Sequence, residues 1–272
     1  MESNTSFEPL PIALSIAGSD SGGAAGIQAD LLTFAANEVY GTTALTCITA
    51  QNPDGVSAIN AVHPEDIAAQ IKQIDSFYKP VAVKTGMLFS SEIISVVCRE
   101  LNALSLNPRI VVDPVMVASS GATLLKAEAI SLIKSQLLPL ATLVTPNLDE
   151  AEILIERKLT SKADIEEAAF HLSSTYQAAF LIKGGHLPGN ELFDTLALPG
   201  KTVETYEQTR ILDIDTHGSG CTLSSAIAAG FAKGLEIVEA VEGALKYLRG
   251  GMQQPLPIGG SNFINHFPRN IR

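Results

Sequence analysis

Short apolar segments that alternate with helix-like segments constrain the fold of this chain more than any other feature. The apolar segments occupy residues 12–17, 44–49, 81–83, 110–112, 143–144 and 179–182. The stretches between them place apolar residues at helical spacing, as Ile67, Ile71 and Ile74 do. Strands that alternate with helices pair in parallel, and right-handed crossovers put helices on both faces of the sheet. The sequence therefore predicts an α/β fold, a three-layer α/β/α sandwich around a central, mostly parallel sheet.

The pattern changes after residue 183. Short apolar runs around 192–198 are consistent with antiparallel strands, and later stretches predict two closing helices, near residues 220–229 and 238–248. No internal repeat or interdomain linker is visible in the sequence. We therefore expect a single domain over 1–272, with 1–10 and 255–272 as terminal extensions on the surface.

Composition supports one large core and disfavours some partners. The chain has 272 residues, of which 46% are hydrophobic and only 17% charged, so it has ample material for a single buried core. The formal net charge is −11, and Lys and Arg form no cluster. A nucleic-acid partner is therefore not expected.

The sequence also bears on cellular location. Residues 1–8 are polar and lack the basic start and apolar core of a secretory signal, and no apolar run reaches about 18 residues. Cys47, Cys98 and Cys221 are odd in number and widely spaced, which suits neither a disulfide framework nor a zinc site. We expect a cytoplasmic protein without a membrane partner.

The strongest candidate site is the stretch 215–222, where a glycine-rich turn leads into a helix of small residues. Gly218, Ser219 and Gly220 allow the backbone to approach a phosphate closely, and the positive end of the helix favours negative charge. Cys221 lies at this positive end, which predicts a lowered thiol pKa and makes it a candidate proton acceptor. The alternative is a tight loop-to-helix junction with an inert cysteine.

The stretch 16–30 after the first strand is a second glycine-rich candidate. Its spacing does not give the Gly-x-Gly-x-x-Gly pattern of dinucleotide loops, which disfavours a dehydrogenase. A substrate-binding loop with Asp30 on the next helix fits better. The alternative is a plain turn in which Asp30 is a solvated helix residue.

Oxygen-bearing side chains follow two further strands. Asp113 comes after one, and Asn147 and Glu150 come after the next and are three residues apart. They could hold a hydrated magnesium ion, which prefers oxygen ligands. Periodicity alone favours a capping box, in which Asn147 caps a helix and Glu150 reaches back to it.

Two more strand ends carry polar residues. Lys183 precedes Gly184 and Gly185 and could contact phosphate, although a lone lysine is usually a solvated surface charge. Gln51 could pair with ring nitrogens and an amino group. Gln51 and Met87 could equally be a surface residue and a core residue.

Read together and in this order, these stretches resemble the hydroxymethylpyrimidine/phosphomethylpyrimidine kinase family of thiamine biosynthesis, in the ribokinase-like superfamily. The resemblance covers about residues 12–251. Its most specific elements are the segments 17–30, 84–88, 113–116, 145–150, 183–186 and 215–221.

The resemblance implies a fold, a reaction and a cofactor. A ribokinase-like kinase would transfer the ATP γ-phosphate to 4-amino-5-hydroxymethyl-2-methylpyrimidine and then phosphorylate the monophosphate to the diphosphate. Mg²⁺ would assist both steps. Kinship also implies a homodimer.

The resemblance also assigns roles to residues of this chain. It implies that the pyrimidine is bound by Gly18, Asp30, Gln51, Met87 and Val115. It implies that ATP and its phosphates are bound by Asn147, Lys183 and Gly185, and that magnesium is organised by Asp113 and Glu150, directly or through water. The implied reaction centre consists of Gly218, Ser219, Gly220, Cys221 and Lys183.

One departure from the family pattern bears on specificity. The first loop reads Ser-Gly-Gly-Ala-Ala-Gly over 21–26, where the family more often has Ser-Gly-Gly-Ala-Gly. Two other readings remain: a pyridoxal kinase of the same superfamily, and a non-catalytic pyrimidine sensor. A sugar kinase is disfavoured because Cys221 replaces the expected Asp.

Overall fold

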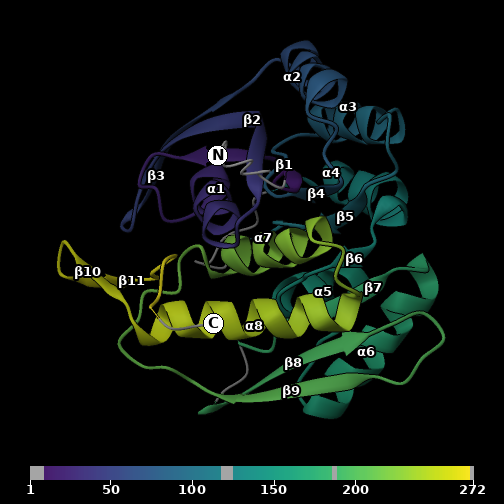
Figure 1. Ribbon diagram of the computed structural model, residues 1–272. Helices are drawn as coiled ribbons and strands as arrows, with labels where there is room; N and C mark the ends of the chain where they lie inside the picture. Colours follow the sequence, from purple (N-terminus) through teal and green to yellow (C-terminus); the bar gives the residue numbers. More distant parts are fainter. Residues whose placement is uncertain (1–8, 118–124, 186–188, 270–272) are drawn as a thin grey trace, which may run out of the picture.

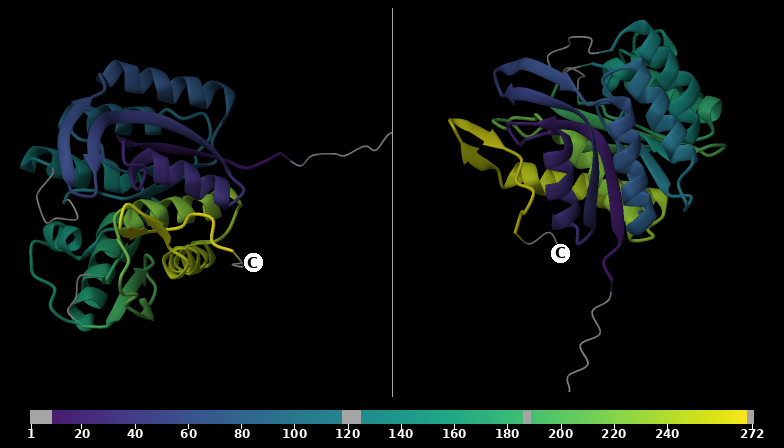
Figure 2. Two further views of the ribbon diagram at one scale, coloured as in Figure 1. Left: turned by 90° about the vertical axis from the view of Figure 1, so that its left-hand side faces the viewer. Right: turned by 90° about the horizontal axis from the view of Figure 1, so that it is seen from above.

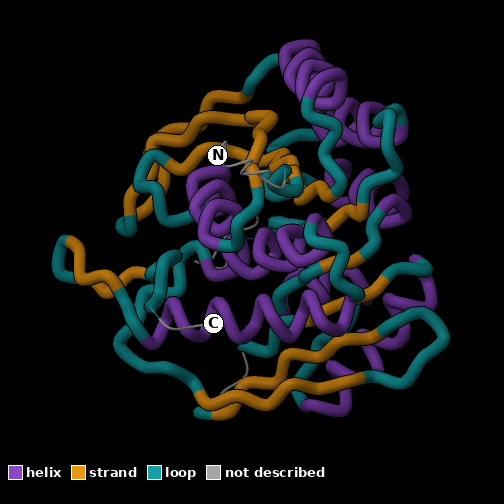
Figure 3. The backbone as a smooth tube through the Cα atoms, in the orientation of Figure 1, coloured by secondary structure: helices purple, strands orange, loops and turns teal. Residues whose placement is uncertain are grey.

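A mixed sheet runs through the whole molecule (Figure 1). The computed structural model describes residues 9–117, 125–185 and 189–269. Within these residues the sheet has nine strands, in the order β3-β2-β1-β4-β5-β6-β7-β8-β9. The strands are β1 (Ile12–Asp20), β2 (Tyr40–Asn52), β3 (Gly55–Ala61), β4 (Ala82–Thr85), β5 (Arg109–Val112), β6 (Leu143–Val144), β7 (Ala179–Ile182), β8 (Glu191–Ala197) and β9 (Glu204–Thr209). Figure 3 shows them in orange, from the β2–β3 pair to the β8–β9 pair.

The pairing confirms the predicted strand directions. Every pair from β2 to β7 across the centre of the sheet is parallel, whereas β3, β8 and β9 pair antiparallel with their neighbours. The antiparallel β8 is the run expected around 192–198. Strand β3 was not predicted, because all its side chains are exposed and it therefore carries no core-facing apolar pattern.

Helices cover both faces of this sheet (Figures 1 and 2). The helices are α1 (Gly26–Ala36), α2 (Pro64–Phe77), α3 (Ser91–Asn102), α4 (Ala127–Leu132), the short turns η1 (Ile133–Leu137) and η2 (Leu138–Leu140), α5 (Leu148–Ile155), α6 (Lys162–Tyr176), α7 (Ser219–Ala232) and α8 (Ile237–Gln253). Successive residues of the buried strands face opposite layers, so two cores form. Val83 packs with the α2–α6 side, and the preceding Ala82 packs with α1, α7 and α8.

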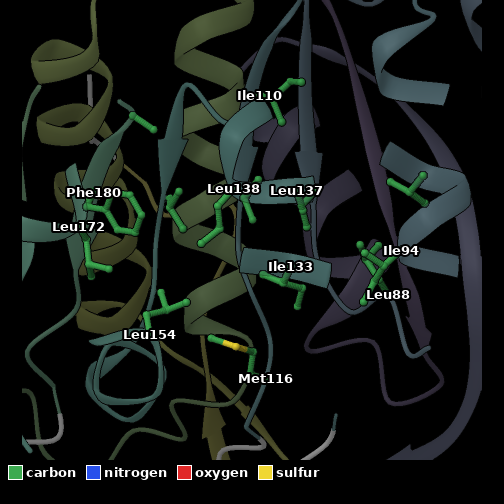
Figure 4. Packing of buried hydrophobic residues seen from close by; sticks show 14 of the residues in the cluster. Leu88, Ile94, Ile110, Met116, Ile133, Leu137, Leu138, Leu154, Leu172 and Phe180 are labelled. Atoms are coloured by element: carbon green, nitrogen blue, oxygen red, sulfur yellow. The ribbon is translucent and has the colours of Figure 1, made fainter. Parts of the chain in front are cut away.

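The larger core lies under α2–α6. Figure 4 shows part of it, with Met116, Ile133 and Leu137 of η1, and Phe180 of β7, which come from three separate segments. The core of the other face is rich in alanines, several of them from α7, and their small size lets α7 and α8 pack closely. The predicted three-layer α/β/α sandwich is thereby confirmed.

The C-terminal segment differs from the predicted surface extension. Strands β10 (Leu256–Ile258) and β11 (Ser261–Phe263) form a hairpin that projects beyond α8 (Figures 1 and 2). The chain then turns back, and Ile264 and His266 are buried. The expected surface extension over 255–272 is therefore wrong for Ile264 and His266. Of the extension expected over 1–10, residues 1–8 lie outside the described residues. Among the residues described, no helix is long and apolar enough to cross a membrane.

Candidate active site

A cavity of about 540 Å³ lies at the carboxyl ends of the parallel strands, where open α/β sheets bind ligands. Segments that follow β1, β5, β6 and β7 meet there with the start of α7. Most of the predicted site residues line it: Gly18, Gln51, Met87, Asp113, Val115, Asn147, Glu150, Lys183, Gly218, Ser219, Gly220 and Cys221. Asp30 and Gly185 are not among the lining residues, and His186 of the same motif lies outside the described residues.

The glycine loop before α7 has the geometry of an anion cradle. Gly218 precedes the helix with φ +82°, and a Cβ there would lie 1.8 Å from the carbonyl oxygen of Ala24, so only glycine fits. A Cβ on Gly220 would lie 3.2 Å from Lys183 Nζ and 3.4 Å from Asp113 Oδ2. The loop therefore leaves open a space between a helix start, an ammonium group and a carboxylate.

Lys183 supplies positive charge to this space. Its Nζ lies 3.4 Å from Asp113 Oδ1. Burial lowers the pKa of Lys183, but the carboxylates of Asp113 and Glu150 outweigh burial, so its pKa lies above the ordinary value. The lysine is therefore an ammonium ion beside the cradle, suited to contact phosphate.

Glu150 forms the predicted capping box with Asn147. The Asn147 side chain accepts from the Glu150 N–H at 2.9 Å, and Glu150 Oε2 accepts from the Asn147 N–H at 2.9 Å. Glu150 Oε1 accepts from the Met116 N–H at 3.0 Å. Burial raises the pKa of Glu150 to about 7.

These carboxylates suit a cation that has few protein ligands and keeps most of its water better than one that is surrounded by protein ligands. Both Glu150 oxygens already accept backbone hydrogen bonds, and Asp113 accepts from Ser224 Oγ at 3.4 Å. The described residues contain no group of three or more His, Cys, Asp or Glu that could hold a metal ion. Mg²⁺ commonly keeps several waters and takes one or two carboxylates, and this donor set suits it.

The structure contradicts the predicted pKa of Cys221. Burial raises its pKa to about 11, although the nearby Lys84 ammonium and the Gly26 N–H act in the opposite direction. The positive end of α7 favours a thiolate, but removing the sulfur from water has the larger effect. The side chain lines the cavity as a neutral thiol.

Asp30 is placed differently from either sequence-based reading. Its carboxylate is fully buried, accepts from Lys84 Nζ at 2.9 Å through both oxygens, and accepts from Ser15 and Ser225 at 2.5 and 2.6 Å. It is neither a solvated helix residue nor exposed to the cavity. Its carboxylate is engaged by Lys84 and two serines, and a direct contact of Asp30 with substrate stays a prediction. Lys84, which lines the cavity, lies between Asp30 and that space.

Sequence reasoning assigned no role to the residues that join the first loop to the α7 loop. Asp20 accepts hydrogen bonds from the backbone N–H groups of Gly22, Ala24 and Ala25 at 2.8 to 3.1 Å. His217 reaches across from the other loop, with Nε2 3.3 Å from Asp20 Oδ2. Their positions within glycine-rich stretches were the only signal available in the sequence.

Val115 contributes an apolar wall under backbone strain. It lines the cavity with φ +42°, a conformation that β-branched residues rarely adopt. Such strain persists where the surrounding structure fixes the chain, and it is common at ligand sites. The strained backbone places Val115 beside the cavity.

Fold and site together define a class of protein. A phosphate cradle at a helix start, an ammonium group and carboxylates lie at the carboxyl edge of a mostly parallel sheet. This is the arrangement of a ribokinase-like small-molecule kinase, and the solved structures most like this chain include such kinases.

Comparisons with known proteins narrow the class to one family. The model of the family described as phosphomethylpyrimidine kinase matches residues 20–266, and the chain belongs to this family. A hydroxymethylpyrimidine/phosphomethylpyrimidine kinase of Synechococcus elongatus is 45% identical and covers 95% of this chain and 98% of its own length. The one from Rhizobium meliloti is 46% identical and covers 95% and 97%.

Two solved structures are informative. The pyridoxal kinase of Bacillus subtilis, in an ADP complex, superposes with a TM-score of 0.87 at 35% identity, covering 97% of this chain and 100% of its own. The phosphomethylpyrimidine kinase of Clostridium difficile has a TM-score of 0.77 at 40% identity, covering 86% and 95%.

Proposed function

We propose that this protein uses ATP to phosphorylate 4-amino-5-hydroxymethyl-2-methylpyrimidine to its monophosphate and then to its diphosphate, in thiamine biosynthesis. The observation that carries the proposal is a single cavity that joins the anion cradle to Gln51 and to apolar walls. Relatives over 40% identical along nearly their full length carry the corresponding name.

The residues act mainly by position and charge. Phosphoryl transfer needs reactants in line and stabilisation of the charge on the transferring oxygens, and it does not need a strong base. The backbone N–H groups at the start of α7 and the Lys183 ammonium supply this stabilisation. Cys221, as a neutral thiol, aligns the substrate hydroxyl, and the loop contributes the larger effect.

Substrate and nucleotide occupy different parts of the cavity in this proposal. Gly18, Gln51, Met87 and Val115 hold the pyrimidine ring. Asn147 and Lys183 hold the ATP phosphates together with Gly185, which lies outside the lining of the cavity. Asp113 and Glu150 would hold Mg²⁺, partly through water, and the bound ion neutralises phosphate charge. Asp30 supports the ring pocket from beneath through its ion pair with Lys84.

We also propose that the protein forms a homodimer and is located in the cytoplasm. Apolar side chains are exposed on both faces of the β2–β3 pair: Ile48, at 51%, lies on one face, and Val56, at 49%, and Ile59, at 38%, lie on the face that lines the cavity. An exposed apolar surface on a sheet edge suits burial against a second copy. Light scattering should give about twice the chain mass of 28.7 kDa, and a mass of one chain would contradict this part.

Pyridoxal kinase activity is the second candidate. It is favoured by the close superposition of the Bacillus subtilis pyridoxal kinase over nearly the whole chain. Pyridoxal also carries a hydroxymethyl group on an aromatic nitrogen heterocycle, so the same cradle could serve it.

A direct comparison of substrates tests the proposal. Magnesium-dependent ATP consumption is measured with mass detection of products, and the hydroxymethylpyrimidine, its monophosphate and pyridoxal are offered separately at equal concentration. We expect both pyrimidine substrates to be phosphorylated. Turnover of pyridoxal alone would move the assignment to the second candidate, and no turnover of any of them would favour a sensor.

A further inference from the structure

Gln51, the residue proposed to read the pyrimidine ring, is itself held by His217. The structure places Gln51 Nε2 2.8 Å from His217 Nε2, and the same ring nitrogen lies 3.3 Å from Asp20 Oδ2. His217 comes from the α7 loop, and Gln51 comes from β2. Both side chains line the cavity.

One ring nitrogen cannot satisfy both neighbours as they are placed. The Gln51 amide nitrogen is only a donor and the Asp20 carboxylate is only an acceptor, so His217 Nε2 would have to accept from one and donate to the other. Asp20 Oδ2 accepts backbone N–H groups of Ala24 and Ala25, which fixes it as an acceptor. With a proton on Nε2, His217 can serve both neighbours only by sharing that hydrogen between two acceptors in a three-centre hydrogen bond, so the Gln51 oxygen must face the ring.

Thr49 supports the same orientation of the amide. Its hydroxyl lies 2.8 Å from the Ser19 carbonyl oxygen and 3.3 Å from the Gln51 atom assigned as oxygen. A hydroxyl has one proton, and the shorter contact to Ser19 takes it, so Thr49 can then only accept from Gln51. The oxygen and nitrogen of an amide are told apart by their partners and not by their shape. Both neighbours of Gln51 thus place its oxygen toward His217 and its nitrogen toward Thr49.

We propose that His217 is the specificity-determining residue of this site: its Nε2–H, held by Asp20, fixes the orientation of the Gln51 amide and so selects an aminopyrimidine ring. An amide has two donor hydrogens and two acceptor lone pairs. His217 occupies one lone pair and Thr49 one hydrogen, which leaves one acceptor and one donor for a ligand. The inference rests on the proposed function and adds the residue that sets its selectivity.

The remaining pair matches the 4-aminopyrimidine edge, where an amino group donates beside a ring nitrogen that accepts. Pyridoxal has no amino group next to its ring nitrogen, so it cannot use both groups in this way. A site built to bond a substrate N–H discriminates strongly, because the analogue that lacks it leaves a polar group unpaired. A freely turning amide would lose this advantage for the pyrimidine and change little for pyridoxal.

The test is the ratio of kcat/KM for the hydroxymethylpyrimidine to kcat/KM for pyridoxal, measured in His217→Leu, His217→Gln and the wild type. We expect the ratio to fall about tenfold in His217→Leu, the worth of one oriented hydrogen bond. His217→Gln keeps a donor near the Nε2 position and should restore most of the ratio. His171→Leu is the matched control, because His171 is exposed on α6, and it should leave the ratio unchanged.

General damage to the α7 loop would lower kcat/KM for both substrates by a similar factor. The ratio of the two values would then stay unchanged. An unchanged ratio in folded His217→Leu would overturn the inference. Calorimetric binding adds a readout without turnover, comparing the hydroxymethylpyrimidine with its analogue lacking the 4-amino group. The wild type should prefer the amino compound and His217→Leu should not. If the wild type binds the amino compound more tightly but phosphorylates neither substrate, only the proposed function is refuted. If the wild type binds the two compounds equally well, the inference is refuted.

Discussion

At the residue scale, Gly218 carries the sharpest geometric requirement of the site. A methyl group there would overlap the Ala24 carbonyl oxygen at a positive φ. We predict that Gly218→Ala lowers kcat by more than about a hundredfold, the effect of losing an oriented N–H donor in an oxyanion site. Gly243→Ala is the matched control, because a Cβ there meets nothing within 4 Å inside α8. It should retain kcat and gain up to about 1 kcal/mol of stability, and equal kcat in both variants would contradict the cradle.

Cys221 gives a pH-dependent prediction. Its pKa is raised to about 11 by burial, so the thiolate, which is the reactive form, forms only at high pH. Alkylation of Cys221 by iodoacetamide, followed by mass spectrometry, should be slow at pH 7 and should still be accelerating at pH 10. A rate that reaches its plateau near pH 8 would show instead the lowered pKa that the helix dipole alone suggests.

The sequence predicted which residues would gather at the site better than it predicted their state. Gly18, Gln51, Lys183 and Cys221 all line the cavity, because strand ends can be located from apolar runs and glycines. The charge of Cys221 and the burial of Asp30 depend on packing by distant segments, such as Ser225 from α7. No pattern along the chain encodes that packing.

At the scale of elements, the C-terminal segment holds the α7 loop from both sides. The Asp215 N–H donates to the Asn262 carbonyl oxygen at 2.8 Å. On the other side, Thr222 Oγ1 lies 3.1 Å from His266 Nε2 and donates to the Gly218 carbonyl oxygen at 2.9 Å. Burial lowers the pKa of His266, which is therefore neutral near pH 7.

We predict that His266→Ala destabilises the protein by about 1 to 3 kcal/mol, because it removes a buried hydrogen bond and leaves a void. It should also lower kcat, since the Gly218 carbonyl loses part of its support. The neighbouring Phe267 is 56% exposed, so Phe267→Ala serves as the control. Urea unfolding measures the stability and steady-state assays measure kcat. Similar results for the two variants would show that the C-terminal segment does not support the α7 loop.

Asp194 on β8 should make stability depend on pH. Burial raises its pKa to about 6, against the opposing effects of the Gly184 N–H and Lys183. Because the folded-state pKa lies above the unfolded value, the contribution of Asp194 is greatest below about pH 4 and is lost as pH rises through about 6. Asp194→Asn keeps an acceptor for Gly184. The unfolding free energy of Asp194→Asn minus that of the wild type should therefore increase by about 2 kcal/mol as pH rises from 4 to 7. Urea unfolding at several pH values measures this difference, and a difference that stays constant would contradict the prediction.

Element prediction succeeded where one face of a segment is buried and failed where no face is. The central strands were located because runs such as 179–182 are apolar throughout, as strands covered on both faces must be. Strand β3 is exposed along its length, and its pairing depends on β2 alone. The return of the chain at Ile264 rests on tertiary contacts with α7 and α8, such as those of His266 with Thr222 and of Asn265 with Gly251.

At the scale of the whole molecule, the sheet order brings the site together. β1, β4, β5, β6 and β7 lie side by side and parallel, so the residues that follow them meet at one edge. The helices on both faces leave that edge to loops, and α7 aims its amino end into it. The class of fold and the position of the site follow from strand alternation, whereas the contact between the first loop and the α7 loop appears only in three dimensions.

The proposed two-step kinase activity is tested most directly by a time course of the hydroxymethylpyrimidine with ATP and Mg²⁺, followed by mass spectrometry. We expect the monophosphate to rise and then fall as the diphosphate forms, with one ATP consumed per phosphate transferred. Both steps should be lost together in Gly218→Ala, because one cradle serves both. A folded wild-type protein that forms no phosphorylated pyrimidine would contradict the kinase activity, and a Gly218→Ala variant that retains either step at the wild-type rate would contradict the role of the cradle.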